Sequence, residues 1–201
     1  MRRKCERALK DRSVAGIILA GGRSSRFGRD KALFDFQGRP LIAYVMDAFS
    51  GTARRIIVSV SPGRAASFRE LFGDSIELVE DDSPFEGPLF GIAKAVEMVS
   101  EEFVLLAPCD MPFLDRALYR LLLMRIEEHE AAMPILRNYH EPIIGAYRTD
   151  SLRRAAVTAI SKGHRKLSSI LAELDVIGVS ELELKGAGID HIAFMNIDAQ
   201  P

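Results

Sequence analysis

The stretch Ile17-Ile-Leu-Ala-Gly-Gly-Arg-Ser-Ser-Arg-Phe-Gly-Arg-Asp-Lys31 decides the fold of this chain. It starts inside an apolar run, Val14–Leu19, that predicts a buried strand. A loop with three glycines follows that strand: Gly21, Gly22 and Gly28. Glycine lets the backbone approach a ligand closely, and exposed backbone N–H groups bind anions. The same loop carries four cations that suit a polyphosphate: Arg23, Arg26, Arg29 and Lys31. We therefore expect a nucleoside triphosphate loop after the first strand of an α/β sheet.

Two better-known phosphate loops do not match this stretch. A P-loop requires Gly, any four residues and then Gly-Lys-Ser/Thr. Here five residues separate Gly22 from Gly28, and Arg29 follows. The dinucleotide fingerprint Gly-x-Gly-x-x-Gly is broken because Gly21 and Gly22 are adjacent. A glycine-rich turn with solvated basic side chains is the alternative that carries no function.

The pattern from Leu19 to Lys31 is Leu-x-Gly-Gly-x-x-Ser-Arg-x-Gly-x-Asp-Lys, and it resembles the signature loop of the GT-A-like nucleotidyltransferases. Within that superfamily it most resembles the molybdenum cofactor guanylyltransferases, over about residues 14–198. The resemblance implies a three-layer, Rossmann-like α/β fold, with a mostly parallel sheet and helices on both faces. It also implies that GMP passes from GTP to molybdopterin-bound molybdenum cofactor, with release of pyrophosphate. Four loop residues would then line the nucleotide: Leu19, Ala20, Gly21 and Gly22.

Length and charge fit a single small enzyme domain. A chain of 201 residues can bury roughly 70% of its extended surface. The net charge of −1 gives no overall attraction to nucleic acid, and no apolar run approaches the length of a membrane helix. Residues 1–13 form a charged tail without the apolar stretch of a secretory signal. We expect a cytoplasmic protein that binds neither nucleic acid nor a membrane.

Cysteine and histidine contribute little recognisable chemistry. Two cysteines are too few for a disulfide framework, and Cys109 is expected to be a small buried residue at a strand end rather than a reactive thiol. The four histidines are scattered without metal-ligand spacing. The chain also lacks a Gly-x-Ser-x-Gly motif, so covalent hydrolase chemistry is not indicated.

The first half of the chain alternates short apolar runs with helical patterns. Strands are predicted at Val14–Leu19, Arg55–Val60, Ile76–Val79 and Phe103–Ala107. Helices are predicted at Pro40–Phe49, Ala65–Phe72, Pro88–Val99 and Arg116–Glu128, with Asp115 capping the last. Pro40 and Pro88 suit the first position of a helix. Strands that are apolar almost throughout, alternating with helices, indicate a parallel sheet covered on both faces.

The second half of the chain changes character. Ala131–Leu136 and Ile143–Arg148 are expected to pair antiparallel. Helices are predicted at Thr149–Ile160 and Lys166–Leu174, and late strands at Val176–Val179 and His191–Phe194. We expect one domain in which a nucleotide-binding half, about residues 14–112, shares a sheet with an acceptor-binding half, about residues 113–201.

Asp110 directly follows an apolar run, so it should lie beyond the carboxyl end of the fourth strand. Ligands of open α/β sheets bind at that rim, where the Gly21 loop is also expected. A carboxylate there suits Mg²⁺, which often takes only one or two protein oxygens beside phosphates and waters. A cap or turn aspartate is the alternative. The segment Pro108-Cys-Asp-Met-Pro112 resembles the metal-binding segment of the guanylyltransferases, which implies Mg²⁺ at Asp110, with Mn²⁺ as a substitute.

Two further segments match the nucleotide pocket of the resembling family. Asp81 follows the third strand, and Gly87 begins the segment Gly-Pro-Leu-x-Gly. A carboxylate accepts two hydrogen bonds side by side, as the N1–H and N2 amino donors of guanine require. An acidic turn before a helix is the alternative. Ser59 stands where the family pattern has an asparagine near the nucleotide, and its hydroxyl can form the same kind of hydrogen bond.

The late part of the chain supplies the remaining candidates. Phe194-Met-Asn-Ile-Asp198 resembles a family segment whose second conserved position binds metal in wider relatives, which implies Asp198 as a second ligand; a polar strand end is the alternative. The resemblance also places His140, Arg165 and Lys166 on the acceptor side, where a phosphorylated pterin needs cations. As an isolated run, residues 163–167 would more often be a solvated loop.

The expected reaction needs charge neutralisation and in-line positioning more than a strong base, because the acceptor phosphate is already anionic. Arg26 would hold the departing pyrophosphate and Lys31 the α-phosphate, with Asp110 as the third catalytic residue. Cytidylyl transfer to the same cofactor, or nucleotidyl transfer to a sugar phosphate, remains an alternative. An assembly factor that binds nucleotide without turnover is another. Proteins that make or receive the cofactor are further candidate partners.

Overall fold

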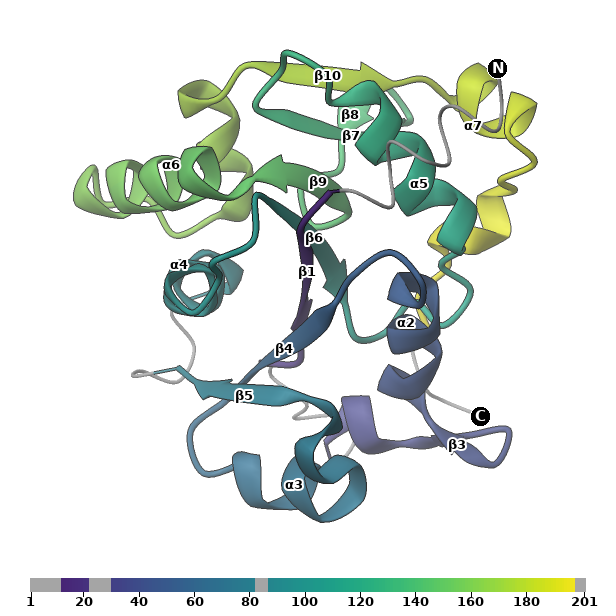
Figure 1. The fold of residues 1–201 in the computed structure, drawn as a ribbon, viewed down its shortest axis with the longest axis vertical. Helices are drawn as coiled ribbons and strands as arrows, with labels where there is room; N and C mark the ends of the chain where they lie inside the picture. Colours follow the sequence, from purple (N-terminus) through teal and green to yellow (C-terminus); the bar gives the residue numbers. More distant parts are fainter. Residues whose placement is uncertain (1–11, 22–29, 82–86, 198–201) are drawn as a thin grey trace.

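The computed structural model describes residues 12–21, 30–81 and 87–197, and a single twisted sheet runs through them (Figure 1). The strand order is β10-β7-β9-β6-β1-β4-β5, and β8 pairs with β7. The strands of this sheet are β1 (Val14–Leu19), β4 (Arg55–Val60), β5 (Glu77–Glu80), β6 (Phe103–Pro108), β7 (Ala131–Leu136), β8 (Tyr139–His140), β9 (Gly145–Arg148) and β10 (Val176–Val179). Strands from both halves of the chain therefore share one sheet.

The apolar first strand lies at the centre of the sheet. β1 pairs in parallel with β4 and with β6, and its residues from Val14 to Ile18 are buried. This explains its unbroken apolar sequence, because a strand between two neighbours and two helical layers has no solvent face. Leu19 lies beside both Ser59 and Pro108 in the register. The carboxyl ends of the three strands thus open at the same rim, as predicted.

Helices cover both faces of the sheet, which confirms the expected α/β layers. α2 (Leu41–Phe49) and α5 (Arg116–Arg125) pack on one face, and α3 (Ala65–Phe72) joins the same core. α4 (Pro88–Glu97) and α6 (Thr149–Ser161) contact each other on the other face (Figure 1). Pro88 is at the start of α4 and Asp115 caps α5, both as predicted. None of the helices in the described part of the chain is long and apolar enough to cross a membrane.

Gly16 explains how closely α2 approaches the central strand. A Cβ atom built on Gly16 would lie 2.4 Å from a ring carbon of Phe49, which is fully buried. The Phe49 ring in turn meets Tyr119 edge to face, with 4.8 Å between the ring centroids. The Tyr119 hydroxyl donates to the Leu106 carbonyl at 3.0 Å, so the one polar atom of this aromatic pair is satisfied.

The structure corrects several predicted elements. His191–Phe194 is a 3₁₀ helix, η4, and not a strand. Asp190 caps it by accepting from the Ile192 N–H, Ala193 is buried and Phe194 packs partly buried against the core. Lys166–Leu174 contains a 3₁₀ helix, η3 (Leu167–Glu173), rather than an α-helix. Pro40 precedes α2 instead of starting it, because it belongs to a hairpin of β2 (Asp35–Phe36) and β3 (Arg39–Pro40).

Besides the β2–β3 hairpin and β8, three short elements were not predicted. η1 (Lys31–Leu33) and η2 (Gly73–Ser75) are single 3₁₀ turns, and α7 (Glu181–Gly186) is a six-residue helix. α7 had a readable signal, since Ser180 and Glu183 form a capping box. Other boundaries moved by one to three residues: β5 starts at Glu77, α4 ends at Glu97 and α5 ends at Arg125.

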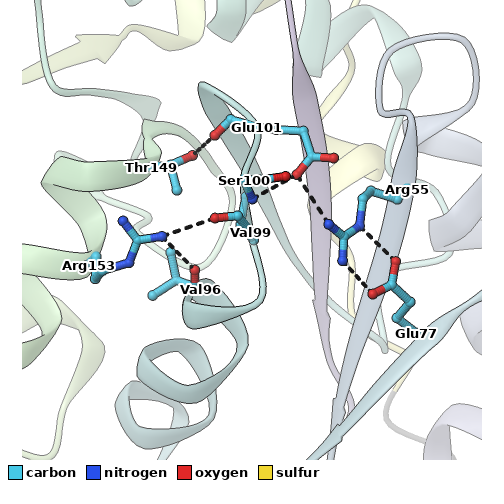
Figure 2. Close-up of polar contacts among 8 residues, drawn as sticks. All are labelled: Arg55, Glu77, Val96, Val99, Ser100, Glu101, Thr149 and Arg153. Carbon is cyan, nitrogen blue, oxygen red and sulfur yellow. Dashed lines mark hydrogen bonds and ion pairs between the residues drawn. The ribbon is translucent and has the colours of Figure 1, made fainter.

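A network of charged side chains closes the rim at the amino ends of the strands, opposite to the Gly21 loop (Figure 2). Arg153 on α6 donates to the carbonyls of Val96, in the last turn of α4, and Val99, just beyond it, at 3.1 and 3.0 Å. The Val96 carbonyl also accepts from the Val99 N–H at 3.1 Å, so the guanidinium adds a charged donor there and supplies a donor to the Val99 carbonyl. Nearby, Arg55 pairs with Glu77 through two hydrogen bonds and with Glu101 at 3.6 Å. The network joins α4, α6, β4 and β5, and it lies far from the rim that carries the Gly21 loop.

Replacing Arg153 with alanine is expected to lower the free energy of unfolding by about 1–3 kcal/mol, because two partly buried carbonyls lose a charged donor. Urea unfolding followed by circular dichroism measures this. Arg154→Ala is the matched control, since Arg154 is 56% exposed and bonds Glu130 at the surface, where a pair contributes at most about 1 kcal/mol. If both variants lowered the free energy of unfolding equally, the stabilising role given to the Arg153 hydrogen bonds would be wrong.

Candidate active site

The loops after β1 and β6 meet through one ion pair at the carboxyl rim of the sheet. Lys31 Nζ donates to Asp110 Oδ2 at 2.8 Å, and the two side chains are only 17% and 23% exposed. Lys31 reaches this point because η1 starts there, directly after the loop. Asp110 reaches it because β6 ends at Pro108. Two residues 79 positions apart, both predicted at this rim, are therefore in contact.

Asp30 has a structural role next to this pair. Its Oδ1 accepts from the Ala32 N–H at 3.2 Å and so caps η1, which fixes where Lys31 begins the turn. Burial raises the pKa of Asp30, while the hydrogen bond from Ala32 acts in the opposite direction. The capping bond therefore orients Lys31 through the backbone.

Cys109, beside Asp110, is partly buried and packs against the core. Burial is the largest cause that raises the pKa of its thiol, to about 12, and the negative charge of Asp110 adds to it. A thiol with a raised pKa is a poor nucleophile. This agrees with the expectation that Cys109 is not a reactive thiol, although the side chain is partly rather than fully buried.

The surroundings of Asp110 suit a metal ion that arrives with phosphates. The Asp110 carbonyl accepts from the Ile197 N–H at 2.9 Å, so the segment before Asp198 lies against it. Within residues 12–21, 30–81 and 87–197, no three His, Cys, Asp or Glu side chains cluster as they would in a metal site built from protein ligands alone. Mg²⁺ needs only one or two carboxylates when nucleotide phosphates complete its shell. The donor set around Asp110 fits that kind of site.

Asp81 directly follows β5, the edge strand that pairs with β4. Its Oδ1 accepts from the Ser59 hydroxyl at 3.2 Å. A Cβ atom on Gly21 would lie 3.1 Å from its Oδ2, so the carboxylate faces the start of the glycine loop. Asp81 is partly exposed, whereas Ser59 is 1% exposed. The structure thus brings three predicted nucleotide residues together, with Ser59 behind the carboxylate.

Gly87, in the first half of the chain, packs against Arg165 in the second half. Its φ of 102° lies in the region that only glycine adopts easily, and a Cβ atom there would lie 2.8 Å from the Arg165 carbonyl oxygen. The residue before α4 therefore packs directly on the turn that follows α6. Arg165 and Lys166 are exposed beside it. The predicted acceptor cations thus stand next to the predicted nucleotide segment.

His140 lies elsewhere on the sheet. It is exposed in β8, and its Nε2 atom would be 3.0 Å from a Cβ atom on Gly178 in β10. Leu19 and Ala20 lead into the loop, and the Ala20 N–H donates to the Ser59 carbonyl at 2.8 Å. Gly22, Arg26 and Asp198 lie outside the described residues.

Gly91, the last residue of the segment Gly-Pro-Leu-x-Gly, contacts Ser59 and Asp81, which the sequence did not predict. It lies in the first turn of α4, and a Cβ atom there would be 2.6 Å from Ser59 Oγ and 3.0 Å from Asp81 Oδ1. The strand register explains why these side chains meet. Ser59 pairs with Val79 in parallel register, and side chains alternate along a strand, so Asp81 shares its face.

Comparison with known proteins agrees with this geometry. A family model described as a MobA-like NTP transferase domain matches residues 16–177. A protein of Halalkalibacterium halodurans, named "Probable molybdenum cofactor guanylyltransferase", is 31% identical over 189 residues, which cover 91% of this chain and 92% of that protein. A protein of the same name from Haloferax mediterranei is 29% identical over 191 residues, 94% of this chain and 90% of its own.

Two solved structures share the fold. Molybdopterin-guanine dinucleotide biosynthesis protein A from Archaeoglobus fulgidus superposes with a TM-score of 0.75 at 24% identity, over 92% of each chain. The 2-C-methyl-D-erythritol 4-phosphate cytidylyltransferase from Thermus thermophilus superposes with a TM-score of 0.71 at 21% identity, over 94% of each chain. Both have the mostly parallel sheet flanked by helices that the resemblance implied.

Proposed function

The chain belongs to the family of MobA-like NTP transferases, and we propose that it transfers GMP from GTP to molybdopterin-bound molybdenum cofactor, releasing pyrophosphate. The observation that carries the proposal is the contact between Lys31 and Asp110 at the carboxyl rim, at 2.8 Å. The contact brings an ammonium and a carboxylate together after the glycine loop, and these are the groups that a nucleoside triphosphate and its metal ion would require. The names of the relatives support the guanine nucleotide and the cofactor acceptor.

The reaction forms one P–O bond and breaks another. An oxygen of the acceptor's terminal phosphate attacks the α-phosphorus of GTP, and the bond to the β-phosphate oxygen breaks to release pyrophosphate. Since the attacking oxygen is already anionic, no general base is needed, and the protein contributes orientation and positive charge. Lys31 would contact the α-phosphate. Arg26, in the loop, would hold the departing pyrophosphate with its planar fork.

Nucleotidyltransferases generally use a divalent metal ion, and we propose Mg²⁺, with Mn²⁺ as a substitute. Asp110 would hold it, with Asp198 as a second ligand, and the nucleotide phosphates would complete the shell. When bound, the ion would neutralise phosphate charge. The ammonium of Lys31 at Asp110 Oδ2 shows that a cation fits against this carboxylate.

We propose that Asp81 recognises the base. Its carboxylate would accept from the N1–H and N2 amino groups of guanine, beside Gly21, which leaves room for a purine. Adenine has no donor at either position, so ATP would leave the carboxylate unpaired. An unpaired polar group costs about 1–3 kcal/mol, which corresponds to a preference for GTP of roughly tenfold or more.

The second half of the chain would bind the acceptor. Arg165 and Lys166 are exposed beside Gly87 and would attract the phosphate of the pterin cofactor, with His140 further along the same half. Proteins that supply or receive the cofactor are the proposed macromolecular partners. The proposed location is the cytoplasm, because the nucleotide substrate is found there.

Pyrophosphate release tests the function directly. With purified protein, Mg²⁺ and molybdopterin-bound cofactor, GTP should yield pyrophosphate and a guanine dinucleotide product, at least about tenfold faster than ATP. Parallel reactions with CTP and with sugar phosphates are the controls. Faster turnover with CTP would replace the proposal with cytidylyl transfer, a chemistry known for one protein of the same fold. Transfer to a sugar phosphate, or GTP binding without pyrophosphate release, would also overturn it.

A further inference from the structure

The carboxylate of Asp81 is held by a buried hydroxyl. Ser59 lies at the end of β4, is 1% exposed and donates to Asp81 Oδ1 at 3.2 Å. Its position follows from the register, which pairs Ser59 with Val79 and so puts Asp81 on the same face of the sheet. Because Ser59 is buried behind Asp81, its hydroxyl serves the carboxylate and is not directed at solvent, where a nucleotide would lie.

Gly91, in the first turn of α4, lies directly against the Ser59 hydroxyl and the Asp81 carboxylate. A Cβ atom on Gly91 would lie 2.6 Å from Ser59 Oγ, 3.0 Å from Asp81 Oδ1 and 3.3 Å from Asp81 Oδ2. Contacts below 3.0 Å force atoms to move, so even alanine at this position would displace the hydroxyl or the carboxylate. Gly91 is buried in the helix, and its conformation does not itself demand glycine. The need for glycine here comes from the two side chains that it faces.

Gly21 limits the carboxylate from the opposite side, since a Cβ atom there would lie 3.1 Å from Asp81 Oδ2. Asp81 therefore stands between the end of β1 and the start of α4, with one oxygen bonded to Ser59. Each carboxylate oxygen has two lone pairs, so Oδ1 can accept from Ser59 and still accept from a ligand. Holding an acceptor in one orientation before binding lowers the entropy that binding costs.

We propose that Ser59 and Gly91 are positioning residues that fix the Asp81 carboxylate for pairing with the guanine edge. The proposal rests on the proposed function, in which Asp81 accepts from guanine N1–H and the N2 amino group. It assigns Ser59 a different role from the direct nucleotide contact expected from the sequence. Ser59 supplies the bond that orients the carboxylate, and Gly91 supplies the space that the bond requires.

Nucleotide binding to the full-length protein tests this with GTP and ITP, because ITP lacks only the N2 amino group. Gly91→Ala should weaken GTP binding about tenfold and reduce the ratio of GTP to ITP affinity, since misplacing Asp81 removes the extra bond first. Ser59→Ala should weaken GTP binding by about threefold to tenfold, the usual value of one hydrogen bond. Isothermal titration calorimetry measures the affinities of the wild type and of both variants for GTP and for ITP.

The double variant makes the test sharper. Removing Ser59 Oγ opens space for the new methyl group of Ala at position 91, so the combined loss should be smaller than the product of the two single losses. Gly186→Ala is the matched control, because a Cβ atom there has nothing within 4 Å. Thermal unfolding checks that each variant is folded, and Ser59→Ala decides the question if Gly91→Ala does not fold.

Asp81→Ala separates this inference from the proposed function. If Asp81→Ala leaves GTP affinity unchanged, base recognition by Asp81 is wrong and the positioning role falls with it. If Asp81→Ala weakens GTP binding but folded Ser59→Ala and Gly91→Ala bind GTP and ITP like the wild type, only the positioning role is wrong. Fully multiplicative losses in the double variant would also overturn the shared role.

Discussion

Asp110→Asn is expected to lower turnover by ~10²-fold or more, the usual loss when an electrostatic stabiliser is removed from an active site. The substitution keeps the shape of the side chain, so it can still accept from Lys31, whose Nζ lies 2.8 Å from Oδ2. It removes the negative charge that would bind Mg²⁺. The fold should therefore survive while metal binding weakens. Steady-state kinetics across a Mg²⁺ titration, together with Mn²⁺ binding measured by electron paramagnetic resonance, checks both effects.

Asp115→Asn is a matched control for that variant. Asp115 is exposed, lies five positions further along and caps α5 by accepting from the Ala117 N–H at 2.7 Å. Asparagine caps a helix about as well as aspartate, so turnover and stability should both stay near wild type. Unchanged turnover of Asp110→Asn at saturating Mg²⁺ would show that Asp110 is not the metal ligand.

Lys31→Ala is expected to lower kcat by ~10²-fold with a smaller change in KM for GTP, because the ammonium would act where charge develops at the α-phosphate. A second effect follows from the ion pair. In the wild type the ammonium lies on the carboxylate that would bind the metal, at 2.8 Å. Its removal frees Asp110 Oδ2 from this competitor, so the nucleotide-free variant should bind Mn²⁺ more tightly.

Lys185→Ala provides the comparison for Lys31→Ala. Lys185 is an exposed cation in α7, and its loss should leave kcat, KM and Mn²⁺ affinity near wild type. A fall in kcat without tighter Mn²⁺ binding would contradict the competition between Lys31 and the metal. If Lys31→Ala had wild-type kinetics, Lys31 would not be catalytic, and the loop would be only a glycine-rich turn.

The central strands were predictable because most of their residues are buried. Val14–Leu19 and Arg55–Val60 appear with the predicted bounds, since a strand covered on both faces must be apolar at nearly every position. Short segments near the surface were not predictable. His191–Phe194 contains apolar residues that suit a strand, but the cap at Asp190 and the burial of Ala193 alone select a 3₁₀ turn. The hairpin at 35–40 likewise depends on Gln37 and Gly38 adopting positive φ.

The amino-acid sequence by itself determined the alternation of strands and helices, the rim at which the Gly21 loop and Asp110 lie, and the identity of the family, because these follow from burial patterns and from a loop with several matching positions. Only the tertiary structure decided which side chains meet. Lys31 reaches Asp110 across 79 residues, and the Ser59 hydroxyl donates to Asp81. Such contacts depend on strand register and on how closely α4 approaches the sheet, and sub-ångström packing of this kind leaves no periodic trace in a single chain.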